Sequence, residues 1–365
     1  MHPLSPGVSF LLATLALLAA TVAFLWAWVA LSARVFRVRA FFDESYDVAT
    51  EDGATIVLSR IRPRGEPRGL PPVVLCHGLA MNRRAFALHE KRSFAVAFAE
   101  RGRDVWLLEL RGSADAAPPT AIAKASFDDY ATHDVPAALA FVREKTGANE
   151  VDWVGFSMGG MLAYAFLGAR RGAGVRRLAT IGSPVRFSEH PAARAFATFP
   201  LLLSPFLSLA RTPFRWLALV AAPLVWPGVP RALSRGLRGE HYNGRWIRRM
   251  MANTLADVPS GVSKQFVRWL RAGTFDSNDG RFDYLDGLAS ITVPTFIVAG
   301  SHDRLAPPTA VLEAAERITA PVETLQVGAR FGTRHDYDHL DLILGRDAVS
   351  DVFTPVAQWL DRRSL

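Results

Sequence analysis

The sequence predicts an α/β protein in which helices flank a mostly parallel sheet, and two observations carry that prediction. The first is the motif Gly155-Phe156-Ser157-Met158-Gly159, which has an apolar run before it and a helix-like run after it. The second is the pair of later β-rich runs, each followed by a polar loop with an acid or a histidine. Such an alternation of strands and helices is typical of a parallel α/β sheet.

The glycine-flanked serine is the most informative of these features. Val151–Gly155 is predicted to be a short buried strand, and Met161–Phe166 belongs to the helix that follows. In this context the motif is typical of a nucleophile elbow, where a strained turn exposes the serine hydroxyl above a sheet. The flanking glycines let strand and helix approach closely. Ser157 is therefore the predicted nucleophile, in preference to a chance serine in a glycine-rich turn.

The acid and the base of a catalytic triad are expected in two later loops. Pro294–Gly300 is an apolar, β-rich run, and Asp303 follows it. Val322–Val327 is the predicted last strand, and both His335 and His339 lie in the loop after it. A serine hydroxyl needs an imidazole to take its proton and a carboxylate to orient that imidazole. The pattern predicts Asp303 as the acid and leaves both histidines open as the base.

The donors that stabilise an oxyanion are expected near an early strand. Pro72–Cys76 is predicted to be that strand, and we assign the donors to the backbone amides of Leu79 and Met158. His77 is interpreted as a residue that supports the loop by hydrogen bonding, not as a base. Cys76 is the only cysteine, so it forms no internal disulfide and is predicted to be a small core residue.

The same segments carry a family resemblance. The matching stretches are Tyr46-Asp47-Val48-Ala49-Thr50-Glu51-Asp52-Gly53, His77-Gly78-Leu79, Asp104–Leu107 to Arg111-Gly112, Ser126–Tyr130, Asp134–Ala137, Thr146-Gly147, the elbow, Asp303 and His339-Leu340-Asp341. They resemble the acid lipases of the α/β-hydrolase superfamily, which include the lysosomal and gastric lipases and bacterial relatives. The likeness covers residues 45–165 and 293–345 and implies the α/β-hydrolase fold. Because the family's base precedes Leu-Asp, it favours His339 over His335.

The chain departs from the animal acid lipases at the elbow and in its middle segment. Those lipases have a His before the Ser and a Gln after it, where this chain has Phe156 and Met158. The resemblance therefore implies the fold and the triad but not triacylglycerol or sterol-ester specificity. The chain also shows a looser likeness to polyhydroxyalkanoate synthases, which use Cys at the elbow, and Ser157 argues against that chemistry.

Composition agrees with a single α/β domain that carries an insertion. The chain has 365 residues, of which 50% are hydrophobic, enough for a sizeable core. Its formal charge is +8, but 38 of the 42 basic residues are Arg, which suggests codon bias. No nucleic-acid-binding motif accompanies the charge, so nucleic acid is not an expected partner.

The N-terminus predicts a membrane anchor at residues 8–33. These 26 uncharged residues are long enough to cross a hydrocarbon core of about 30 Å. A cleaved signal peptide is disfavoured because Met1–Gly7 has no Lys or Arg and the apolar run is too long. Arg34, Arg37 and Arg39 follow the span, so the positive-inside rule places the catalytic domain in the cytoplasm.

The middle of the chain predicts an inserted, mainly helical cap. Residues 185–290 separate two expected parts of the hydrolase core, 45–184 and 291–365. About 100 residues are too many for an ordinary connection between a strand and a helix, so the segment needs structure of its own.

The composition of this cap points to lipid. Two apolar blocks, Phe199–Ala210 and Trp216–Pro227, are too short to span a bilayer. From Arg170 to Met250 there are fourteen Arg, no Lys and two acids, which gives a net charge of +12. Docking on anionic lipid fits this pattern. An equally weighted alternative is that the blocks close the core and the Arg side chains are solvated.

These features together predict a serine hydrolase that cleaves apolar or lipid esters through an acyl-enzyme, with no metal or organic cofactor. His335 and His339 lack a third metal ligand at a recognisable spacing, and Asp351 is a weaker acid candidate because it lies beyond both histidines. Two alternatives remain. The same triad could transfer the acyl group to another acceptor, or the protein could be a catalytically silent, membrane-tethered interaction protein, which the intact Ser, Asp and His disfavour.

Overall fold

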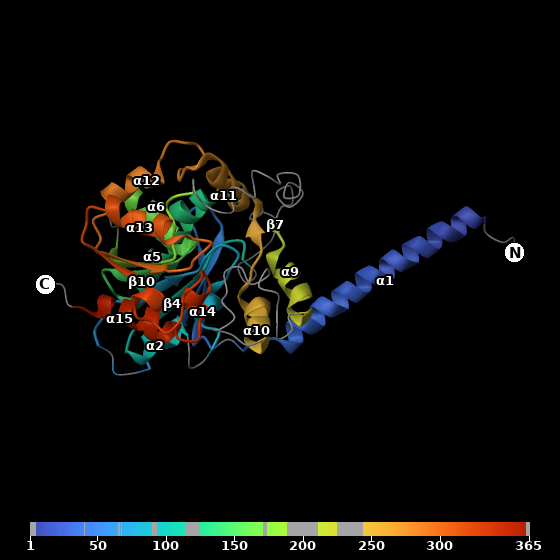
Figure 1. The fold of residues 1–365 in the computed structure, drawn as a ribbon, viewed down its shortest axis with the longest axis horizontal. Coiled ribbons are helices and arrows are strands. Elements are labelled where there is room, and N and C mark those ends of the chain that lie inside the picture. Colours follow the sequence, from blue (N-terminus) through green and yellow to red (C-terminus); the bar gives the residue numbers. More distant parts are fainter. Residues whose placement is uncertain are drawn as a thin grey trace.

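The protein folds into a body built on one large sheet, from which a long N-terminal helix projects (Figure 1). The computed structural model describes residues 5–39, 41–64, 66, 68–89, 93–113, 125–170, 174–187, 211–224 and 244–362. Buried side chains form two hydrophobic clusters. The sheet contributes to both, because alternate residues of a strand point to opposite faces.

The sheet has eight strands in the order β1-β2-β4-β3-β5-β6-β9-β10. Their bounds are β1 (Glu44–Ala49), β2 (Thr55–Ile61), β3 (Val73–Cys76), β4 (Val105–Glu109), β5 (Val151–Phe156), β6 (Val175–Ile181), β9 (Thr295–Gly300) and β10 (Val322–Val327). β2 runs antiparallel to β1 and β4, and every other neighbouring pair is parallel. The carboxyl ends of β3, β5, β6, β9 and β10 therefore meet at one edge, where open α/β sheets carry their sites.

The central strands are buried along their whole length. All residues of β3, β5 and β9 are buried, as expected of parallel strands covered on both faces. The predicted strands match these elements, and Val322–Val327 coincides with β10. Thus the mostly parallel sheet with flanking helices is confirmed.

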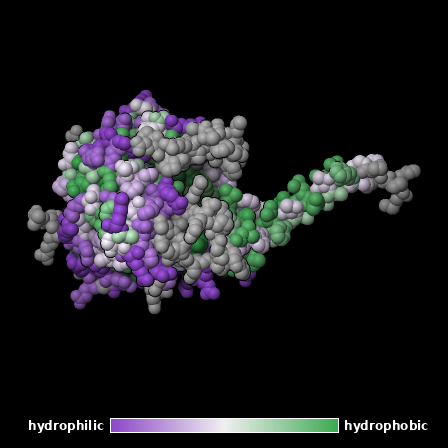
Figure 2. Space-filling model, viewed as in Figure 1, coloured by the Kyte–Doolittle hydropathy of each residue, from purple (hydrophilic) through white to green (hydrophobic). Residues whose placement is uncertain are grey.

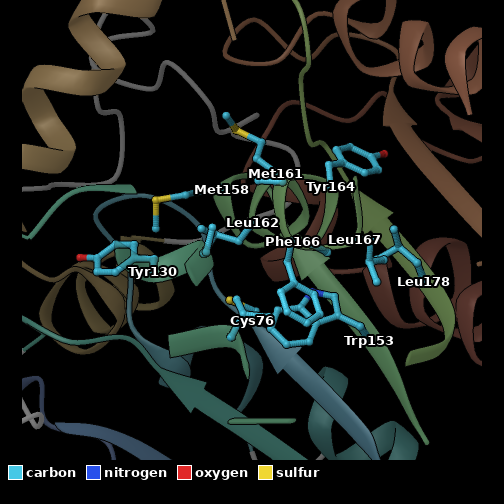
Figure 3. Close-up of a cluster of buried hydrophobic side chains, with 14 of the residues drawn as sticks. Cys76, Tyr130, Trp153, Met158, Met161, Leu162, Tyr164, Phe166, Leu167 and Leu178 are labelled. Carbon is cyan, nitrogen blue, oxygen red and sulfur yellow. The ribbon is translucent and has the colours of Figure 1, made fainter. Parts of the chain in front are cut away.

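The helices that pack on the sheet are α2 (Phe94–Glu100), α5 (Val135–Thr146), α6 (Met158–Arg170), α13 (Pro308–Arg317), α14 (Asp341–Leu344) and α15 (Thr354–Asp361). Figure 3 shows how α6 is anchored, with Leu162 and Phe166 lying close to Trp153 of β5 and Cys76 of β3. Cys76 is fully buried, as predicted. The helix that follows the elbow is thus held against the two central strands.

The predicted insertion lies between β6 and β9. Its described parts contain α9 (Phe214–Ala221), α10 (Gly244–Thr254), α11 (Ser260–Ala272), α12 (Tyr284–Gly287) and a two-stranded sheet of β7 (Arg211–Thr212) and β8 (Val258–Pro259). The apolar block Phe199–Ala210 lies outside the described residues, and the second block is described as far as Leu224.

The N-terminal helix α1 (Pro6–Val35) is long and apolar enough to cross a membrane, with a mean hydropathy of 2.4 over its best window. Its last turns contact the insertion, where Trp28 Nε1 donates a hydrogen bond to the carbonyl oxygen of Val220 in α9 (3.1 Å). Figure 2 shows that the apolar surface of α1 continues onto the adjoining edge of the body.

A partly buried ion-pair network links the end of α15 to the segments that precede β3 and β4 and to β5. The Asp361 carboxylate accepts from Arg68 (2.9 Å), Arg101 (2.7 Å) and Arg103 (2.9 Å), and Arg103 also reaches Asp152 of β5 (2.6 Å). Burial opposes ionisation of Asp361, but Arg101 and Arg103 outweigh it and hold the pKa of Asp361 below its ordinary value. A depressed pKa means that the ionised carboxylate stabilises the fold.

We expect Asp361→Asn to lower the free energy of unfolding by about 2 kcal/mol at neutral pH, since it breaks charge-assisted hydrogen bonds. In the wild type this stabilisation is present above the unfolded carboxyl pKa of about 3.9 and is lost as the pH falls toward the lower folded value. The variant should therefore lose less stability on acidification. Denaturant unfolding of the full chain in detergent at neutral and acidic pH checks this, with exposed Asp47→Asn as the control. Parallel pH dependences for wild type and variant would contradict the assignment.

Candidate active site

Ser157 has a left-handed backbone at the junction of β5 and α6. Its φ is +51°, and among the described residues Ala80 is the one other non-glycine residue with positive φ. The Ser157 amide donates to the carbonyl oxygen of Ile181 in β6 (2.8 Å). A residue with a Cβ rarely adopts this conformation, and where it does the strain is often functional. The sharp turn predicted for a nucleophile elbow is therefore present.

Close backbone packing surrounds this turn. A Cβ on Gly159 would lie 2.1 Å from the carbonyl oxygen of Cys76, so only glycine fits. A Cβ on Gly78 would lie 3.1 Å from the Cβ of Ser157. The first turn of α6 thus presses on the end of β3, and the loop after β3 runs directly beside the serine.

His339 and Asp303 form a buried pair. The Nδ1 of His339 lies 2.7 Å from Asp303 Oδ2, and the Asp303 side chain has no exposed surface. The other carboxylate oxygen accepts from the amides of Leu305 (2.9 Å) and Ala306 (2.7 Å). With Nδ1–H donating to the carboxylate, a neutral imidazole keeps the lone pair on Nε2, the atom that can take a proton.

The His339 ring is held at the same edge of the sheet as Ser157. It lies 4.8 Å, centroid to centroid, from the ring of Phe156, the residue before the serine. It also packs on Gly182, where an added Cβ would be 3.3 Å from Nδ1 and from Cε1. Since Ile181 accepts the Ser157 amide, the serine and the imidazole both flank the end of β6. The structure therefore brings Ser157, His339 and Asp303 into one neighbourhood.

The other candidate residues have different surroundings. His335 Nε2 lies 3.6 Å from Asp347, not at Asp303, and Asp351 accepts from the Tyr337 hydroxyl (2.8 Å). In the described part of the chain, no group of three or more His, Cys, Asp or Glu is arranged to hold a metal ion. Asp303 is thus paired with His339 alone of the two candidate bases.

His77 forms a hydrogen bond within the loop after β3, as the sequence predicted. Its Nδ1 donates to the carbonyl oxygen of Gly78 (2.9 Å), and its Nε2 lies 3.9 Å from Glu109. Burial lowers the pKa of His77, so the neutral imidazole is favoured. Glu109 also binds the side chain of Arg83 (2.9 Å) and thereby links this loop to the next one.

The two predicted oxyanion donors border one small cavity. Leu79 and Met158 both line it, together with Tyr130, Arg111 and Ser113. Met158 is the first residue of α6, where a helix leaves its amides without an intrahelical acceptor. The Met158 amide, one residue after the serine, is therefore available to a ligand.

Sequence reasoning missed three residues that support this geometry. Gly182 provides the surface on which His339 rests, and Asp338 accepts from the His339 amide (2.8 Å) and from Arg304 (2.8 Å). Asn82 is bonded to a segment about 170 positions later in the chain. Asp338 could have been noticed as the acid beside the histidine, but Gly182 and Asn82 act through contacts with residues distant in sequence.

Comparisons with known proteins agree with this architecture. The family model described as "alpha/beta hydrolase fold" matches residues 71–343. "Lipase 1" of Drosophila melanogaster is 26% identical over 295 residues, covering 73% of this chain and 66% of its own length. Human "Lysosomal acid lipase/cholesteryl ester hydrolase" is 32% identical over 136 residues, 34% of each chain. The chain thus spans about two thirds of the first relative and one third of the second.

A solved structure shows the same fold at low sequence identity. An esterase from Exiguobacterium antarcticum superposes with a TM-score of 0.56 at 18% identity, covering 87% of this chain and 99% of the esterase. With most of the chain matched by the family model and a mostly parallel central sheet, the chain belongs to the α/β-hydrolase family and, within it, resembles the acid lipases, as its motifs predicted.

Proposed function

We propose that the protein is a carboxylic ester hydrolase that uses Ser157 as nucleophile, His339 as base and Asp303 as the acid that orients it. The observation that carries this proposal is the 2.7 Å contact between His339 and Asp303 at the edge of the sheet where Ser157 has its left-handed backbone. Membership of the α/β-hydrolase family and similarity to lipases and esterases support ester cleavage.

The proposed reaction passes through an acyl-enzyme. His339 Nε2 removes the proton of Ser157 as its Oγ attacks the ester carbonyl, and the amides of Leu79 and Met158 stabilise the oxyanion. Collapse breaks the bond to the alcohol, which leaves with the proton from His339. Water, deprotonated by the same imidazole, then attacks the acyl group and regenerates Ser157. Asp303 holds the tautomer and stabilises the imidazolium. These steps require no metal or organic cofactor.

An apolar acyl ester, including a lipid ester, is the proposed substrate class. The lipases that this chain resembles, one of them named a cholesteryl ester hydrolase, support this class. We assign the hydrolase core to residues 45–184 and 291–365 and the cap to residues 185–290.

We further propose that α1 anchors the protein in a membrane and that α9 touches the lipid surface. Helix α9 and the turn after it leave four large apolar side chains exposed: Phe214, Trp216, Leu217 and Leu224. Because α9 is bonded to the end of α1, these side chains continue its apolar surface. Arg34 and Arg37 at this end of α1 and Arg215 on α9 are exposed, which suits anionic headgroups on the cytoplasmic side.

Replacing the nucleophile tests the proposed function. We expect Ser157→Ala to lower kcat for p-nitrophenyl esters by at least about ten-thousand-fold, because no other group supplies the covalent step. The measurement is hydrolysis of short- to long-chain esters by the detergent-solubilised full chain, with exposed Ser350→Ala as the control. A wild type that neither turns over any ester nor reacts with a fluorophosphonate at Ser157 would refute the proposal.

Gly182→Ala tests whether Gly182 positions the imidazole of His339. The added Cβ would lie 3.0 Å from Leu342 Cδ1 and 3.3 Å from the ring of His339, and we expect kcat to fall roughly 10- to 100-fold, since small misplacement of a catalytic group is costly. Gly147→Ala is the matched control, because Gly147 also has a positive φ but no atom within 4 Å of its added Cβ. Both variants should lose about 1 kcal/mol of stability from the left-handed backbone. An equal effect of the two on kcat would remove the proposed role of Gly182.

A fluorescent label tests the lipid surface. Cys76 is fully buried, so Leu217→Cys can be labelled selectively with a polarity-sensitive dye in the full chain. In vesicles that contain anionic lipid, we expect doxyl lipids to quench this label, because α9 lies at the interface. The control is exposed Glu316→Cys on α13, which lies far from α1 in Figure 1. Equal quenching at both sites would refute the proposed contact between α9 and the lipid surface.

The same variant tests the topology. Labelling of Glu316→Cys by an impermeant maleimide in intact cells would refute the placement of the catalytic domain in the cytoplasm.

A further inference from the structure

The loop that carries the proposed oxyanion donor Leu79 is bonded to the cap segment Asn253–Ala256. The Asn82 amide donates to the carbonyl oxygen of Thr254 (2.9 Å), and the Ala256 amide donates to that of Ala80 (3.0 Å). Between them, Met81 and Leu255 form an antiparallel bridge. The side chain of Asn82 adds a bond to the carbonyl oxygen of Asn253 (2.9 Å). We call residues 79–82 the oxyanion loop.

The side chain of Asn253 does not bind the oxyanion loop but residues 36–38, which follow α1 and which we call the exit of α1. Its Oδ1 accepts from the Val38 amide (2.9 Å), and its Nδ2 donates to the carbonyl oxygens of Phe36 (2.9 Å) and Arg249 (2.6 Å). The residue is 8% exposed, so these amide bonds lie away from bulk water. One asparagine at the end of α10 therefore binds the exit of the N-terminal helix with its side chain and the oxyanion loop with its backbone.

We propose that Asn253 is a positioning residue that couples the exit of α1 to the oxyanion loop and so sets the position of the Leu79 amide for catalysis. The inference rests on the proposed function and deepens it. The oxyanion loop needs such external support, because Ala80 next to Leu79 holds a strained left-handed backbone (φ +57°). The contact of α1 with the rest of the protein and the position of the oxyanion donor are then linked through the side chain of Asn253.

A purely structural role for Asn253 would give a different result. Loss of its buried hydrogen bonds would then lower the stability of the fold without changing the rate of the folded enzyme. A positioning role lowers kcat and leaves KM unchanged, because oxyanion donors act mainly in the transition state. It also loosens the oxyanion loop itself, which amide exchange at Asn82 reports.

The test is Asn253→Ala in the full chain, reconstituted like the wild type and assayed on a short, water-soluble ester. We expect kcat to fall roughly tenfold, less than the 100- to 1000-fold cost of deleting a donor, because the amide is displaced and not removed. KM should be unchanged, and the Asn82 amide should exchange faster. Thr146→Val, which removes a helix hydrogen bond on α5 (2.7 Å), is the control and should leave kcat and Asn82 exchange unchanged.

Two further variants keep the test decisive if Asn253→Ala fails to fold. Asn253→Asp keeps the acceptor for Val38 but loses both Nδ2 donors, and it should show a smaller fall in kcat of the same kind. Asn82→Ala removes the side-chain bond between the oxyanion loop and Asn253. Because coupling is reciprocal, this variant should speed exchange of the Val38 amide. Unchanged kcat in folded Asn253 variants would overturn the coupling while leaving the hydrolase intact. Absence of wild-type turnover would instead count against the proposed function.

Discussion

The contact between the first turn of α6 and the end of β3 is the constraint on which the rest of this structure depends. Gly159 lies so close to the carbonyl oxygen of Cys76 that no side chain fits between them. This approach forces the chain to turn sharply after β5, and Ser157 takes the left-handed backbone as a consequence. Packing of α6 against Trp153 offsets the strain, because a buried aromatic side chain contributes a large apolar area.

The proposed acid–base pair is built independently of that turn. Asp303 follows β9 and His339 follows β10, and the adjacent parallel strands bring the two loops together. Both carboxylate oxygens of Asp303 are occupied, which leaves the imidazole one orientation. The ring of His339 packs against Phe156, the residue before the serine, and against Gly182 at the end of β6. The small size of Gly182 therefore matters for the site, because it helps to set the distance between two separately built halves.

The proposed cap and α1 are connected to the proposed site by hydrogen bonds. The cap is bonded to the oxyanion loop on one side and to the exit of α1 on the other. Helix α9 lies at the same end of the body as α1 (Figure 1). The proposed membrane anchor is thereby linked, through Asn253, to the loop that carries the proposed oxyanion donor Leu79.

The sequence by itself determined the parts of the protein whose signals are local. The elbow, the strands around it and the uncharged N-terminal helix all follow from short patterns of glycine, apolar and charged residues. The order of Ser157, Asp303 and His339 along the chain was also legible, and the His-Leu-Asp motif separated His339 from His335 through family resemblance. These predictions depend on neighbours in the chain, and the elements appear where they were expected.

Only the tertiary structure decided which residues support the site. Gly182 must be small because the ring of His339, more than 150 positions later, packs on it. Asn253 lies at the end of an ordinary amphipathic helix, and its importance comes from bonds to Phe36 and to Asn82. No local pattern encodes such contacts, because they arise only when the sheet order places distant segments side by side. The physical reason is that hydrogen bonds and close packing act through space, whereas sequence motifs record only what is near along the chain.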